Sequence, residues 1–143
     1  MTFGLTSNPG GWPTSNDSDL TDYTYTLNNI NYTFKLKNVK QNSGYLMCTS
    51  VAVIGLPAIE GYKLVSVKAS NSSTCSTTTK VGISSSATSA SYISGGDAQT
   101  WSATGSNYTY SLTSTSANTV YYLYVTNKNA QVTALELTYN PAN

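Results

Sequence analysis

Residues 23–36 read YTYTLNNINYTFKL, and this stretch predicts a β-hairpin. Apolar and polar residues alternate with the period of two that is typical of a strand with one buried face. The apolar positions are Tyr23, Tyr25, Leu27, Ile30, Tyr32, Phe34 and Leu36. Asn28 and Asn29 separate the two halves, and asparagine tolerates the positive φ that a tight hairpin turn requires.

Similar short stretches recur along the chain and predict an antiparallel, jelly-roll-like β-sandwich of about 8 to 10 strands. They lie at residues 63–69, 80–84, 108–112, 120–125 and 132–139. In the first of these, Val65, Val67 and Ala69 are expected to point inward. Residues 120–125 are apolar on both parities, as in a strand covered on both faces, with Tyr122 inward and Tyr121 outward. Sequences rich in Gly, Asn and Ser separate these stretches, and no apolar stripe of helical period persists.

The length of 143 residues suits one domain spanning residues 1–143. Residues 1–20 are rich in Pro and Gly and predict an irregular N-terminal segment. Trp12 either anchors this segment or lies at a binding rim. The start of the chain lacks the features of a signal peptide, so we expect a domain excised from a larger surface protein and exported by sequence outside this chain. The longest apolar run, residues 51–57, is too short for membrane insertion.

The polar side of the composition is unusual, with 21 Ser, 22 Thr and 14 Asn but only 9% charged residues. The net charge is +1, which gives no electrostatic attraction to nucleic acid or to an anionic membrane. A surface of hydroxyls, amides and phenols offers the neutral hydrogen-bonding groups that sugars use. Many secreted β-proteins share this composition without binding sugars.

The sequence contains few of the residue types that carry out catalysis, and we predict that the domain is not an enzyme. The chain has no His and no Arg, which removes imidazole bases, catalytic triads and guanidinium clamps. A glycosidase needs two facing carboxylates. The six available carboxylates are Asp17, Asp19, Asp22, Glu60, Asp97 and Glu136.

Two groups of residues, three aspartates and two cysteines, each have two interpretations. Asp17, Asp19 and Asp22 supply hard oxygen ligands that suit a structural calcium ion, or they simply fill a polar loop. No other cofactor is expected. Cys48 and Cys75 either form a disulfide, worth about 3 to 4 kcal/mol in the chain-entropy model, or remain two free buried thiols.

Residues 54–67, IGLPAIEGYKLVSV, resemble the early core of jelly-roll domains of Bacteroidetes surface proteins, where an LP-x-I-x-G-x-K-L-x-x-V pattern leads into a core strand. Residues 94–96, 108–112 and 134–139 are similar to the remainder of that pattern. The resemblance covers residues 30–139. It implies a secreted or cell-surface location and a sandwich similar to galactose-binding-like domains and carbohydrate-binding modules, which accompany glycan-degrading or adhesion proteins. No binding residue carries over from it.

The favoured hypothesis is a non-catalytic module that binds a neutral glycan, an oligo- or polysaccharide, through an aromatic and polar loop. The candidate residues are Trp101, Tyr92, Asp97, Gln99, Asn107 and, at a second position, Trp12. The competing interpretation places Trp101 in the core. The alternative function is a structural or adhesion module that acts as a spacer or docks other domains of its parent chain. Glycan binding predicts an exposed Trp or Tyr cluster, whereas adhesion predicts buried Trp residues with an apolar patch or an unpaired edge strand.

Overall fold

The structure, a computed structural model, describes residues 1–102 and 106–142, and all of its regular elements are strands. The all-β antiparallel class predicted from the sequence is confirmed. The described residues contain no helix long and apolar enough to cross a membrane. The strands are β1 (Thr2–Gly4), β2 (Thr21–Leu27), β3 (Ile30–Asn42), β4 (Tyr45–Gly55), β5 (Tyr62–Asn71), β6 (Thr79–Ser84), β7 (Gln99–Trp101), β8 (Asn107–Ser111), β9 (Tyr122–Val125) and β10 (Ala130–Pro141).

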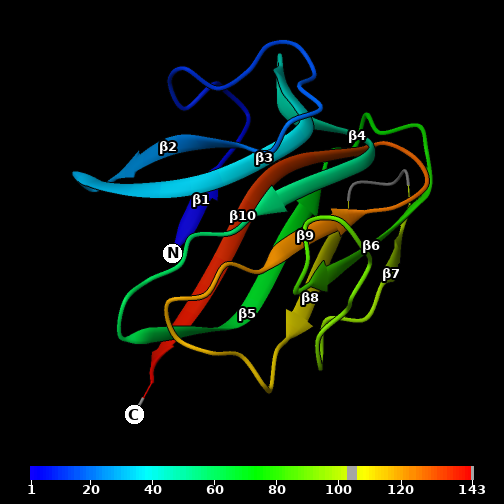
Figure 1. The fold of residues 1–143 in the computed structure, drawn as a ribbon. Coiled ribbons are helices and arrows are strands. Elements are labelled where there is room, and N and C mark those ends of the chain that lie inside the picture. The colour runs from blue at the N-terminus through cyan, green and yellow to red at the C-terminus, as the bar shows by residue number, and fades with distance from the viewer. Residues whose placement is uncertain (103–105, 143) are drawn as a thin grey trace.

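Seven strands follow the order β7-β6-β9-β4-β10-β5-β8 and curl nearly into a barrel (Figure 1). The hairpin β2–β3 joins through β4, and β1 adds to β10. Among the described residues, the two ends of the seven-strand path meet through side-chain hydrogen bonds and not through a ladder between β7 and β8. Gln99 donates to the Thr109 carbonyl at 2.8 Å, and the Ser102 amide donates to the Tyr108 hydroxyl at 2.8 Å. These bonds bring β7 to β8 across the seam.

The predicted hairpin is present, and in its register Tyr23 faces Phe34. Asn28 and Asn29 have φ values of 53° and 65°, which are the left-handed conformations that a two-residue hairpin turn needs. Phe34 is buried as predicted, but Ile30 is 55% exposed. The reason is that the tip of the hairpin projects past the body of the sheet, where no opposing layer covers it (Figure 1).

Parity predictions succeed where strands are regular and fail at irregularities. On β10, Leu135 and Leu137 are buried while Glu136 between them is exposed, as the alternation in residues 132–139 predicts. Val65 was predicted to point inward but is only half-buried, because the β5–β10 register shifts there and makes Val65 an extra residue.

The tyrosine pair at the start of β9 is also reversed relative to the prediction. Tyr121 is buried rather than outward, and Tyr122 is half-buried. Tyr121 precedes β9, so the strand alternation does not govern it. Its hydroxyl accepts a hydrogen bond from the Ser116 amide at 2.8 Å, which holds the side chain inward.

The N-terminal segment is irregular from residue 5 to residue 20, as predicted, but Thr2–Gly4 form the short strand β1. Trp12 is buried and packs on Phe34 with ring centroids 5.4 Å apart. Its indole Nε1 donates to the Thr24 carbonyl of β2 at 2.8 Å. Trp12 therefore anchors this segment and does not form a binding rim.

Candidate binding site

The residue predicted as the main sugar platform, Trp101, is 0% exposed. Its ring stacks on Tyr108 with centroids 4.9 Å apart and an interplanar angle of 8°. Its Nε1 donates to the Tyr110 hydroxyl at 3.0 Å, and that hydroxyl donates to the Val81 carbonyl at 2.5 Å. The ring is stacked and fully buried and its polar edge is hydrogen-bonded inside the domain, so the platform assignment is wrong and the core interpretation holds.

The other residues of the predicted loop do not converge on a site around Trp101. Tyr92 and Gln99 are half-buried, and Asp97 and Asn107 are exposed. The Gln99 amide and the Asn107 side chain hold hydrogen bonds to β8 and β5 respectively. The Tyr92 ring lies so close to Gly82 that a Cβ there would be 2.4 Å from it, so this ring is a packing element.

The proposed calcium ligands are not brought together. The Asp17 carboxylate accepts the Asp19 backbone amide at 2.9 Å, which is a local turn. Asp22 lies on β2 and pairs with Lys35 Nζ at 2.8 Å. Among residues 1–102 and 106–142, no group of three or more His, Cys, Asp or Glu side chains is arranged to hold a metal ion.

Cys48 and Cys75 are both buried and both free in the structure. Burial raises the pKa of the Cys48 thiol to about 12, and the nearby Cys75 contributes in the same direction. Of the two interpretations given above, the structure therefore shows two free buried thiols and not a disulfide.

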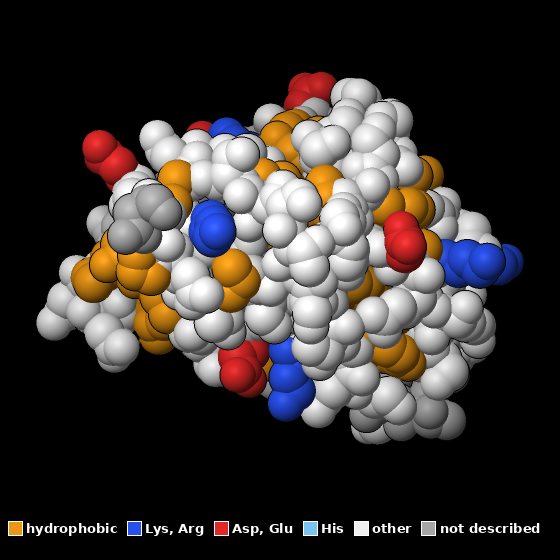
Figure 2. Space-filling model, turned by 90° about the horizontal axis from the view of Figure 1, so that it is seen from below, with side chains coloured by type: hydrophobic (Ala, Val, Ile, Leu, Met, Phe, Trp, Pro, Cys, Tyr) orange, Lys and Arg blue, Asp and Glu red, His pale blue; other side chains and the backbone are white. Residues whose placement is uncertain are grey.

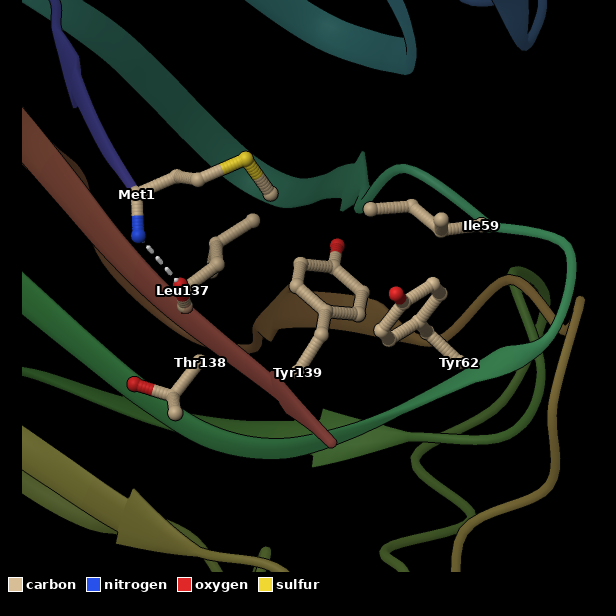
Figure 3. Close-up of a pocket in the computed structure, with 6 residues that line it drawn as sticks. All are labelled: Met1, Ile59, Tyr62, Leu137, Thr138 and Tyr139. Carbon is tan, nitrogen blue, oxygen red and sulfur yellow. Dashed lines mark hydrogen bonds between the residues drawn. The ribbon is translucent and has the colours of Figure 1, made fainter. Parts of the chain in front are cut away.

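A cavity of about 340 Å³ opens at the far end of β10, away from the predicted loop. Leu137, Thr138 and Tyr139 contribute from β10, and Met1, Ile59 and Tyr62 surround them (Figure 3). Met1 and Leu137 bond each other through their backbones, with the Met1 amine 2.7 Å from the Leu137 carbonyl. The lining is mainly apolar, with two phenol groups and one threonine hydroxyl.

The rim of the cavity formed by residues 57–62 is held in place by backbone hydrogen bonds. The Tyr62 amide donates to the Ile59 carbonyl at 3.2 Å, which closes the turn. The Asn118 amide donates to the same carbonyl at 3.2 Å, and the Ala142 amide donates to the Gly61 carbonyl at 3.0 Å. Gly61 has a φ of 80°, which favours glycine at this turn. The rim is thus preorganised.

The two tyrosines of the cavity have different roles. The Tyr139 hydroxyl donates to the Pro57 carbonyl at 2.6 Å, which fixes its ring beside the rim. Burial raises the pKa of Tyr139 above its ordinary value, and the neighbouring Tyr32 adds to the effect. Tyr62 is 44% exposed. Tyr139 is therefore a supporting wall, and Tyr62 presents aromatic surface to solvent beside it (Figure 3).

The surface around this face carries few charges. Figure 2 shows polar uncharged atoms over most of the view, with isolated charged side chains and small groups of hydrophobic atoms. The one ion pair among the described residues joins Lys35 to Asp22. A ligand meeting this surface would encounter mainly neutral hydrogen-bonding groups.

Sequence reasoning missed the cavity because its walls are distant along the chain. The Glu60–Gly61 turn and the apolar parity of Tyr139 were visible, but nothing local shows that Tyr62 pairs with Pro141 in the β5–β10 ladder. No known protein family matches the chain, and no curated protein is significantly similar to it in sequence.

Proposed function

We propose that this domain is a non-catalytic carbohydrate-binding module that holds a neutral glycan at the cavity beside Tyr62. The observation that carries the proposal is the pairing of an exposed tyrosine with a second, fixed tyrosine over a preorganised apolar hollow. In this proposal the sugar binds at the cavity and not at the loop around Trp101.

The chemistry of a sugar suits this arrangement. A pyranose presents C–H groups on its faces and hydroxyls on its edges. Tyr62 offers an apolar ring face for the C–H groups and a phenol for an edge hydroxyl. Thr138 is exposed and adds a second hydroxyl at the cavity. The cavity volume is at the lower end of ordinary ligand sites, which fits one terminal sugar unit rather than a long chain.

The resemblance to Bacteroidetes jelly-roll domains supports the same proposal through its setting. Residues 56–67, which carry the most specific part of that pattern, include the rim of the cavity and the start of β5. A module of this kind would work outside the cytoplasm, on a secreted or surface protein. Its paucity of charge suits a neutral polysaccharide and not an acidic one.

One observation favours a second candidate, the adhesion or protein-docking module. Both tryptophans are buried, and the cavity lining is largely apolar. An apolar side chain of a partner protein would fill such a hollow as well as a sugar face would.

A glycan array probed with the wild-type domain, Tyr62→Ala and Tyr45→Ala tests the proposal. Tyr45 is a matched control because it is half-buried and lies near Val132, at the opposite end of β10 from the cavity. We expect the wild type and Tyr45→Ala to bind the same neutral glycans. Tyr62→Ala should weaken binding at least about tenfold, or about 1.4 kcal/mol, in calorimetric titration.

Two results would contradict the proposal. Absence of binding to every neutral glycan would favour the docking module. Glycan binding that survives in Tyr62→Ala, with both variants equally folded by circular dichroism, would place the sugar elsewhere on the surface.

A further inference from the structure

The two cysteines are held around one short segment at the start of β10. Cys48 on β4 is the direct cross-strand partner of Ala130. Cys75 lies in the connection between β5 and β6, and its Sγ is 3.7 Å from the carbonyl oxygen of Asn129. One thiol is thus opposite residue 130, and the other contacts the residue immediately before it.

The connection that carries Cys75 is fastened to this segment on both sides. The Thr77 hydroxyl donates to the Asn129 carbonyl at 2.6 Å. The Ser72 amide donates to the Gln131 carbonyl at 2.7 Å, and the Thr74 hydroxyl donates to the Gln131 side chain at 2.8 Å. These bonds keep Cys75 beside β10 while Ala130, which is small and fully buried, lies opposite Cys48.

We propose that Cys48 and Cys75 are an oxidisable pair that forms an intramolecular disulfide, which ties β4 to the β5–β6 connection. The oxidant is a small-molecule or protein disulfide of the kind found in oxidising compartments. The raised pKa of Cys48 agrees with this placement, because burial is its main cause and the Cys75 thiol is its second cause.

The chemistry proceeds by two thiol–disulfide exchanges. Cys75, which lies in the β5–β6 connection and is 3% exposed whereas Cys48 is 0% exposed, loses its proton and attacks one sulfur of oxidised glutathione. This attack forms a mixed disulfide and releases one glutathione thiol. Cys48 then loses its proton to water and attacks the Cys75 sulfur, which releases the second glutathione. The protein loses two hydrogen atoms and two electrons, and one molecule of oxidised glutathione becomes two of the reduced form.

The test compares the folded domain after incubation with oxidised glutathione or with dithiothreitol. Each sample is unfolded, alkylated and weighed by mass spectrometry, and a digest identifies the linked peptides. We expect no alkylated cysteine and one Cys48–Cys75 linked peptide after oxidation, and two alkylated cysteines after reduction. The oxidised form should melt roughly 10 °C higher than the reduced form.

Cys48→Ala and Cys75→Ala are the matched controls. Each variant should retain one thiol or one glutathione adduct, and its melting temperature should not rise on oxidation. Two free thiols in the oxidised wild type would overturn the proposal. Two separate glutathione adducts without a linked peptide would also overturn it, because the thiols would then be too far apart to meet.

Discussion

Tyr110→Phe removes one hydroxyl at the centre of a buried hydrogen-bond relay, and its cost can be worked out from the structure. The Tyr110 hydroxyl accepts from Trp101 Nε1 at 3.0 Å and donates to the Val81 carbonyl at 2.5 Å. All three residues are 0% exposed, so water cannot replace the lost oxygen without rearrangement. A buried donor or acceptor left unsatisfied costs about 1–3 kcal/mol. Phe would leave one of each, and we expect a loss of about 2–6 kcal/mol in unfolding free energy.

Urea denaturation followed by tryptophan fluorescence measures this loss. Tyr45→Phe is the matched control, because Tyr45 is half-buried and its hydroxyl accepts a long hydrogen bond of 3.4 Å from the Asn42 side chain. It should change the unfolding free energy by less than about 0.5 kcal/mol. The double variant with Trp101→Phe should cost less than the sum of the single variants by about 0.5–3 kcal/mol. A Tyr110→Phe loss as small as that of the control, or strict additivity, would refute the relay.

Three further predictions concern other parts of the fold. Trp12→Phe should cost about 1 kcal/mol, because the ring stays packed while the indole bond to β2 is lost; an unchanged denaturation midpoint would contradict this. Gly95→Ala should prevent folding or reduce soluble expression sharply, since its Cβ would lie 1.8 Å from a β8 carbonyl oxygen and its φ is +83°; wild-type thermal stability would show that this segment is placed differently. Burial raises the pKa of Tyr110 and Tyr139 above the ordinary 10.0, so the folded state keeps protons that the unfolded chain releases. The unfolding free energy should therefore keep its full value below about pH 10 and decrease as the pH rises further. A urea midpoint that stays constant from about pH 8 to about pH 11.5 would contradict this prediction.

Local patterns were sufficient wherever the structure depends on neighbours along the chain. The alternation in residues 23–36 and the two asparagines between its halves predicted the hairpin and its turn. The alternation in β10 predicted which of its residues face the core. In both cases the signal lies within residues that are neighbours along the chain.

Features that depend on distant pairing were not predictable from local patterns. Trp101 lies in a polar stretch and looked exposed, yet the curling of β7 toward β8 stacks it on Tyr108 and buries it. The cavity depends on Tyr62 meeting the end of β10, a contact between residues almost eighty positions apart in sequence. Asp17, Asp19 and Asp22 are neighbours in sequence, but the strand that carries Asp22 directs it to Lys35 instead.

The hydrogen bond from the Trp12 indole to Thr24 has a consequence for self-association. Among the described strands β2 pairs with β3 alone, so its other side is an edge on which the strand of another molecule could add. Many proteins guard such an edge with charge, but this chain has only 7 Lys and 6 acidic residues in all. Here the N-terminal segment occupies one of the outward carbonyls, and an incoming strand would have to displace a buried aromatic ring to reach it. The cover on this part of the edge is therefore steric and does not depend on charge.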